Sequence, residues 1–249
     1  MRENRAKHKL REKKRIAVAL GGPDHTSDMA DFLGSLGFDA VRFCMEHGQV
    51  AMADLSDMSR ACDLWGMSSL VRVNANEPWL IGRTLDRGIQ GVIVPHVNTR
   101  DEALRLVDGA KFAPIGHRGV AGNRQGYGVA DYLQQANDET IVVAMVEDVV
   151  AIRNLADILT VDHIDVFIVA RNDLAHSMGY LGQSRHPEVE AVFDKTVAQI
   201  IAAGRTAGVQ VTDSDVDKYI DMGVGYLAIH WSNWVKTGAA GFVPKVTKA

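Results

Sequence analysis

Eight short apolar runs, separated by longer amphipathic segments, constrain the fold of this 249-residue chain more than any other feature. The runs are nearly continuous in apolar residues, as parallel strands are when both of their faces are buried. Eight strand–helix units in a chain of this length favour a closed barrel over an open doubly wound sheet. The sequence therefore predicts an α/β fold, a single (β/α)8 TIM barrel over residues 1–249, with strands at Ile16–Leu20, Asp39–Met45, Ser69–Val73, Gly91–Val97, Thr140–Val146, Asp165–Ala170, Val209–Thr212 and Tyr226–His230.

The segments between these runs have the apolar spacing of helices, and glycine follows several of them, where a helix end favours a residue that tolerates positive φ. The glycine-rich segment Lys111–Val129 does not fit a helix and is long for a connection, so we expect a functional loop. Arg118 within it either holds the loop against the barrel mouth or contacts substrate. The expected helices are Ser27–Leu36, Glu77–Arg87, Arg100–Asp108, Val149–Leu159, Pro187–Ala207 and Ser214–Met222.

Charge and hydropathy exclude several classes of partner. Residues 1–15 hold eight of the 27 Lys and Arg residues, in a chain of net charge −4. A nucleic-acid arm is one interpretation, but the segment is short and has no aromatic residues, so we expect a basic helix over one end of the barrel and no nucleic-acid partner. No run is long enough to cross a bilayer, and no signal-type segment is present, so we expect a cytoplasmic protein without a membrane partner. Residues 232–249 are expected at a subunit interface.

Polar side chains stand at five of the predicted strand exits. In a β/α barrel these exits converge on one mouth, where the chemistry takes place. Together the side chains predict a site for a divalent metal and for proton transfer, although His96 fits a barrel-lining histidine bonded to a neighbour equally well. The exits carry Glu46 with His47, Arg72, His96, Glu147 and Asp173.

Glu147 and Asp173 are the basis of the metal hypothesis. Two carboxylates without a nearby cysteine suit a hard cation, so Mg²⁺, Mn²⁺ or Co²⁺ is favoured over a closed zinc site. Open coordination positions would admit a substrate with adjacent carboxylate and carbonyl oxygens, and the metal would polarise the carbonyl. An alternative of equal weight is that both carboxylates cap the helices that follow them, since acidic side chains are favoured at helix N-termini.

Six collinear motifs, found between about Ala17 and Trp231, resemble the HpcH/HpaI family of class II, metal-dependent pyruvate aldolases. They are EHG at 46–48, VRVN at 71–74, RTLDRGIQGVIVPHV at 83–97, GHRGV at 116–120, VED at 146–148 and NDLAHSMGY at 172–180. The resemblance implies a homo-oligomer, hexameric in the family, that uses a divalent cation and no organic cofactor. It implies reversible cleavage of a 4-hydroxy-2-oxo acid into pyruvate, or a related 2-oxo acid, and an aldehyde through a metal-stabilised enolate. The alternatives are a related enolate lyase acting on a CoA thioester or oxaloacetate, and a non-catalytic binding barrel.

The family's site residues match positions of this chain. By this resemblance Glu147 and Asp173 bind the metal, and Arg72 stabilises the enolate oxygen of pyruvate. The backbone around Asn172 receives the pyruvate carboxylate, so Arg72, Asn172 and Asp173 form the substrate-binding set. His47 moves protons between C3 of pyruvate and the C4 hydroxyl of the aldol through a bound water.

Asp86 matches the family's partner of that histidine, but its position raises a geometric difficulty. It lies near the C-terminal end of its predicted helix, which has run back toward the bottom of the barrel. We therefore expect Asp86 to reach His47 of an adjacent subunit. The alternative is a surface aspartate paired with Arg83 or Arg87.

The chain departs from the family pattern beside the expected site. Cys44 and Met45 replace an aspartate and a glycine, Met145 replaces a glutamine, and Ala170 and Arg171 replace a glycine and a proline. These positions normally orient the metal ligands. Arg171 either selects an anionic substrate or points into solvent, whereas Cys44 is expected to be a buried strand residue and not a nucleophile.

Overall fold

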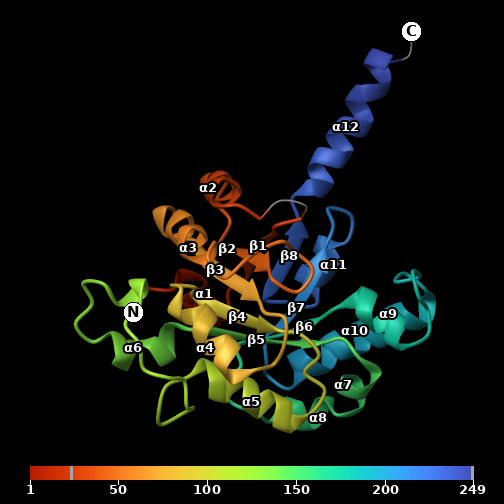
Figure 1. Ribbon diagram of the computed structural model, residues 1–249. Coiled ribbons are helices and arrows are strands. Elements are labelled where there is room, and N and C mark those ends of the chain that lie inside the picture. Colours follow the sequence, from red (N-terminus) through yellow and green to blue (C-terminus); the bar gives the residue numbers. More distant parts are fainter. Residues whose placement is uncertain (23–24, 248–249) are drawn as a thin grey trace.

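Eight parallel strands close into a barrel in chain order, with β8 paired to β1. The computed structural model describes residues 1–22 and 25–247, and Figure 1 shows the strands at the centre of one layer of surrounding helices. The predicted α/β (β/α)8 barrel is confirmed. The strands are β1 (Ile16–Leu20), β2 (Ala40–Cys44), β3 (Ser68–Arg72), β4 (Gly91–Val94), β5 (Ile141–Val146), β6 (Val166–Val169), β7 (Ala207–Val211) and β8 (Tyr226–His230).

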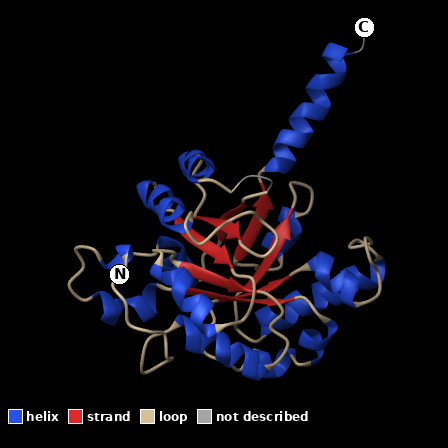
Figure 2. Cartoon of the chain, in the orientation of Figure 1, coloured by secondary structure: helices blue, strands red, loops and turns tan. Residues whose placement is uncertain are grey.

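The helices follow the strands around the outside of the barrel (Figure 2). The expected helix Val149–Leu159 is divided at Asn154 into two short helices, and the expected helix Pro187–Ala207 is too long, since it ends at Ala202. The helices are α1 (Arg5–Arg11), α2 (Ser27–Ser35), α3 (Leu55–Leu64), α4 (Pro78–Asp86), α5 (Arg100–Ala110), the 3-10 turn η1 (Arg124–Gly126), α6 (Tyr132–Glu139), α7 (Val149–Arg153), α8 (Leu155–Ile158), α9 (Arg171–Ser177), α10 (Pro187–Ala202), α11 (Val216–Asp221) and α12 (Ser232–Thr247).

Two apolar layers hold the barrel together. Successive strand side chains point to opposite faces, so β2 sends Val41 and Phe43 outward into the layer shared with the helices. Arg42 and Cys44 point the other way and line the cavity of the barrel. The lower interior is filled by an apolar cluster that includes Ile16, Val18, Leu70, Ile93, Val143 and Val166.

The basic N-terminal segment closes the bottom of the barrel. Ala6 and Leu10 of α1 are buried. The ammonium group of Lys7 donates to the carbonyl of Thr140 at 2.5 Å and lies 3.1 Å from a carboxylate oxygen of Asp165. Thr140 and Asp165 each stand directly before a strand, so the cation is used at the end of the barrel opposite the mouth.

The C-terminal helix is set apart from the barrel. Figure 1 shows α12 extending away from the other elements, and large apolar side chains along it are exposed, among them Trp234, Val235 and Phe242. Within residues 1–22 and 25–247, no helix is both long and apolar enough to cross a membrane. The last two residues of the expected interface segment, 248–249, lie outside the described residues.

Candidate active site

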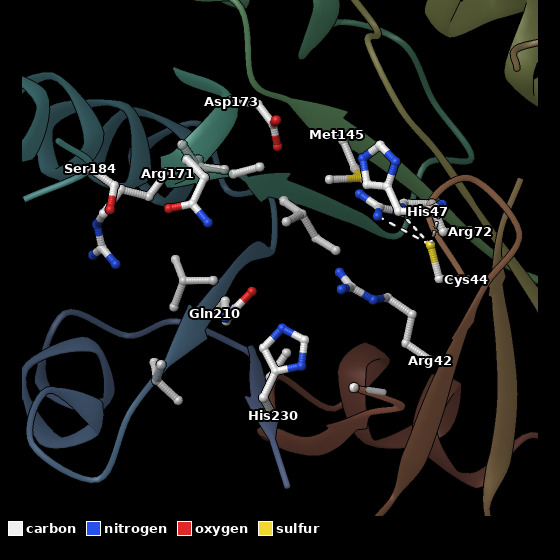
Figure 3. A pocket seen from close by; sticks show the side chains of 18 of the residues that line it. Arg42, Cys44, His47, Arg72, Met145, Arg171, Asp173, Ser184, Gln210 and His230 are labelled. Carbon is white, nitrogen blue, oxygen red and sulfur yellow. Dashed lines mark hydrogen bonds between the residues drawn. The ribbon is translucent and has the colours of Figure 1, made fainter. Parts of the chain in front are cut away.

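A cavity of about 420 Å³ opens where the C-terminal ends of the strands converge. Strand exits and the loops behind them supply its polar lining, as barrel geometry requires. Four of the predicted site residues line this cavity together: His47, Arg72, Asn172 and Asp173. Figure 3 shows His47 and Arg72 on one side of the cavity and Asp173 projecting from another.

Arg72, the last residue of β3, is held by two neighbours from β2 and its exit. Its Nε lies 3.0 Å from Oε2 of Glu46, and its Nε and Nη2 donate to Sγ of Cys44 at 3.3 and 3.1 Å. Cys44 also accepts the backbone N–H of His47. Burial alone raises the pKa of the Cys44 thiol, but these donors outweigh it and the net effect lowers that pKa. Cys44 is buried as expected, and it also orients the arginine.

His47 is the exposed member of the group. Its side chain is 67% exposed, and Nε2 lies 4.0 Å from Oε2 of Glu46. Beside it, Glu46 has a side chain that is only 14% exposed. The loop after β2 therefore holds its carboxylate inward against Arg72 and leaves the imidazole free to meet solvent and a ligand.

Glu147 lies behind the cavity. It is 1% exposed, and its Oε1 accepts the backbone N–H of His96 at 2.7 Å. Burial, helped by the charges of Asp173 and Glu46, raises the pKa of Glu147 to about 7, against the hydrogen bond and the charge of His96. The ring of His96 bonds Asp148 at 2.9 Å, as a barrel-lining histidine bonded to a neighbour does.

The carboxylates fit an open cation centre better than a closed one. In the described ranges no group of three or more His, Cys, Asp and Glu side chains forms a metal site. Asp173 lines the cavity in the first turn of α9, and neither α7 nor α9 has a side-chain cap. The capping alternative therefore has no hydrogen bond to support it. Burial and the negative charge of Asp173 both raise the pKa of Glu147. A divalent cation would supply the positive charge that offsets them.

Asp86 lies outside the cavity of its own chain. It is the last residue of α4, and Oδ1 accepts a hydrogen bond from Nη2 of Arg118 at 2.8 Å. Pairing with Arg83 or Arg87, the alternative considered from the sequence, is wrong for this chain. Arg118 also packs over the ring of Phe112, 4.6 Å from its centroid. It fastens the glycine-rich segment to the end of α4, and it does not line the cavity at the mouth.

Arg171 does not point into solvent, one of its two expected positions, because its side chain is only 10% exposed. Its Nε lies 2.8 Å from Oε1 of Glu190, and Nη2 donates to the hydroxyl of Tyr219 at 2.5 Å. The guanidinium stacks over Phe193, 4.1 Å from the ring centroid. Its charge is thus paired between α10 and α11, while the residue also lines the cavity.

Sequence reasoning missed a polar wall on the other side of the cavity. Arg42 of β2, Gln210 of β7, and Tyr226 and His230 of β8 all line it. The missed signal was the alternation of side chains along a strand. Arg42 stands two residues before the inward-facing Cys44, so it must point inward too. Burial, followed by the charge of Arg42, lowers the pKa of His230 to about 4.

The fold and this mouth define a (β/α)8 barrel with carboxylate, imidazole and guanidinium side chains at the carboxyl ends of its strands. The model of the HpcH/HpaI aldolase/citrate lyase family matches residues 20–226. The chain therefore belongs to the HpcH/HpaI aldolase/citrate lyase family, as its motifs predicted. The predicted class, a carbon–carbon lyase of the aldolase type, is confirmed at the level of the family.

Individual relatives agree. The chain is 34% identical to a hydroxypyruvate/pyruvate aldolase of Roseobacter denitrificans, over 80% of each chain. It is 32% identical to a 4-hydroxy-2-oxo-heptane-1,7-dioate aldolase of Shigella flexneri, over 82% of this chain and 78% of that one. A solved HpcH/HpaI aldolase/citrate lyase family protein from Burkholderia cenocepacia is 29% identical, with a TM-score of 0.89 over 98% of this chain and 99% of that chain.

Proposed function

We propose that this chain is a class II, metal-dependent aldolase that reversibly cleaves a 4-hydroxy-2-oxo acid into pyruvate, or a related 2-oxo acid, and an aldehyde. The observation that carries the proposal is the single cavity shared by Arg72, His47 and Asp173, with Glu147 buried behind it. Within the described residues no lysine lines this cavity. A Schiff-base mechanism therefore has no candidate nucleophile.

Glu147 and Asp173 would hold the divalent cation, Mg²⁺ or Mn²⁺ by the preference of carboxylate oxygens. When bound, the cation would act as a Lewis acid on the carbonyl of the 2-oxo acid. The backbone N–H groups of the first turn of α9, at Asn172 and Asp173, have no acceptor within their helix. They are suited to receive the carboxylate of the 2-oxo acid.

Arg72 and His47 divide the remaining work. Arg72 is 8% exposed and anchored by Glu46 and Cys44, so its positive charge is fixed where the enolate oxygen develops. His47 is exposed and able to take a proton from C3 of the 2-oxo acid or return one, and to exchange it with the C4 hydroxyl through water. The site separates a fixed charge from a mobile proton carrier.

Asp86 completes the site in a homo-oligomer. Its Oδ1 is used by Arg118, whereas Oδ2 makes no hydrogen bond with any described residue. We assign Oδ2 to orienting His47 of an adjacent subunit, and α12 to packing on another copy through its exposed apolar side chains. A hexamer, as in the resembled family, is the assembly expected in solution. Light scattering after size-exclusion chromatography tests it.

Hydrogen exchange at C3 of pyruvate tests the function without knowledge of the aldehyde. Pyruvate in D₂O, followed by NMR, should lose its methyl proton signal with enzyme and Mn²⁺ or Mg²⁺. EDTA should stop the exchange, and added Mn²⁺ should restore it. Glu147→Gln should abolish the exchange. Asp157→Asn, which changes an exposed acid on α8, should leave it intact.

The same assay separates the alternatives. Full exchange by the Glu147→Gln protein would remove the metal centre. No exchange under any metal, together with no turnover of oxaloacetate or a CoA thioester, would leave a non-catalytic barrel.

A further inference from the structure

An arginine without a partner stands inside the barrel. The register pairs Leu20 of β1 with Arg42 on one side and with His230 on the other, so the two polar residues flank β1 at one level. Figure 3 shows Arg42 and His230 pointing into the same space, with Gln210 across from them. Nε of Arg42 is shielded from solvent and makes no hydrogen bond, and no residue of the described ranges forms an ion pair with this guanidinium.

Each of the other arginines of the cavity named here already has a carboxylate partner. Arg72 faces Glu46, Arg171 faces Glu190, and Arg185 donates to Asp215 at 2.7 Å. For Arg42, burial lowers the pKa of the guanidinium and the charge of Arg72 adds to the effect, which Tyr226, Cys44 and Glu147 oppose without reversing it. The Arg42 side chain is half-buried, and a partly shielded cation without a counter-ion is unfavourable. An anion in the cavity would remove that penalty, because a guanidinium matches a carboxylate with two parallel hydrogen bonds.

Neutral donors stand beside this arginine. The hydroxyl of Tyr226 is fully buried and bonds no described residue. Burial raises the pKa of Tyr226 to about 12, so its proton stays in place and can be donated. The low pKa of His230, about 4, keeps its ring neutral, with one N–H donor. Gln210 adds an amide that also lines the cavity.

We propose that Arg42, Tyr226 and His230 form a second anion-binding subsite, which takes a carboxylate at the end of the substrate remote from Glu147 and Asp173. The substrate is then a dianionic 2-oxo acid with a distal carboxylate. This inference rests on the proposed function for the position of the 2-oxo end. One guanidinium with neutral donors matches a singly charged carboxylate, whereas a doubly charged phosphate would remain half neutralised. The cavity of about 420 Å³ exceeds what a three-carbon acid fills.

Two ligands of equal chain length test the subsite by binding alone. 2-Oxoglutarate carries a distal carboxylate where 2-oxovalerate carries a methyl group. Isothermal titration calorimetry with Mg²⁺ should show 2-oxoglutarate binding wild-type protein tighter by roughly 10- to 100-fold, the contribution of a charged hydrogen bond. Arg42→Leu should bring the two affinities together. The control Arg185→Leu removes a cavity arginine that already has a carboxylate partner, and should keep the difference.

Each other outcome is decisive. Equal affinities in wild-type protein, or a difference that survives Arg42→Leu, overturn the subsite. Displacement of 2-oxoglutarate by equimolar inorganic phosphate overturns the carboxylate assignment. If Arg42→Leu fails to fold, Tyr226→Phe replaces it and should reduce the difference several-fold. If wild-type protein does not exchange the C3 hydrogens of pyruvate but still binds 2-oxoglutarate tighter than 2-oxovalerate, the result counts against the aldolase proposal. If it exchanges them but binds the two ligands equally, the result counts against the subsite.

Discussion

The ion pair between Asp86 and Arg118 permits a test that separates a structural role from a catalytic one. It joins the end of α4 to the glycine-rich segment, and the Arg118 side chain is 2% exposed against 31% for Asp86. Two unit charges about 4 Å apart attract by roughly 4 kcal/mol at an effective dielectric constant near 20. Partial hydration of Asp86 and the desolvation of Arg118 reduce this, and we expect a coupling energy of about 2 kcal/mol.

Removing either partner has a different consequence for the one that remains. Asp86→Ala leaves a buried guanidinium without its carboxylate partner and should lower the free energy of unfolding by about 2 to 3 kcal/mol. Arg118→Met leaves an aspartate that can hydrate, so adding Asp86→Ala to it should have little further effect. Urea unfolding of the two single variants and the double variant gives the coupling energy. Arg87→Met, also near the end of α4, is the matched control and should show no coupling to Asp86.

Turnover measured on the same proteins distinguishes the structural role of Asp86 from its proposed catalytic role. If Asp86 also orients His47 of an adjacent subunit, Asp86→Ala should lower kcat on the order of 100-fold, the usual contribution of an acid–base group. Arg118→Met should lower it far less. A coupling energy below about 0.5 kcal/mol would refute the ion pair. Equal kcat values for Asp86→Ala and Arg118→Met would refute the catalytic assignment.

Four further outcomes follow from the structure. Iodoacetamide near neutral pH should alkylate Cys44, whose pKa is lowered, before Cys62, whose pKa burial raises, and mass spectrometry of peptides reads the order. Phe43→Ala should lower the free energy of unfolding by about 3 to 5 kcal/mol, because the ring is fully buried between β2 and the helices. Deleting residues 236–249 should reduce the mass of the assembly seen by light scattering, and an unchanged mass would exclude α12 from the interface. The folded pKa of His230, about 4, lies below its ordinary 6.5, so stability should be fully present above pH 6.5 and fall as the pH drops toward 4; His230→Asn should remove this part of the pH dependence in urea unfolding.

The barrel could be predicted from the sequence because strands buried on both faces carry apolar runs that few other structures produce. The start of β7 could not, because Ala207 and Gly208 lack that signature. A Cβ added at Gly208 would lie 2.8 Å from a side-chain carbon of Ile168, so the small residue is required by packing between strands. That requirement comes from a neighbour about 40 residues away, which no local pattern shows.

Some site residues could likewise be predicted from local sequence, and others could not. His47, Arg72 and Asp173 were found because strand exits converge whatever fills the barrel. Arg42 was missed because it lies within an apolar run, one inward-facing position below the exit of β2. The partner of Asp86 was also missed, since Arg118 reaches it from a segment 32 residues further along the chain. Contacts of this kind depend on how a loop packs, and local spacing carries no information about them.

The charges of the mouth impose a direction on any dianionic ligand. Glu147 and Asp173 extend from the exits of β5 and β6, whereas Arg42 and His230 belong to β2 and β8 on the other side of the cavity. A free carboxylate placed among the acidic groups would be repelled, and only an end with adjacent carboxylate and carbonyl oxygens can chelate a cation held there. With the proposed metal centre and the proposed subsite both in place, a substrate with two carboxylates would have one favourable orientation. The charges that would recognise this substrate would then also decide which of its carbons meets His47.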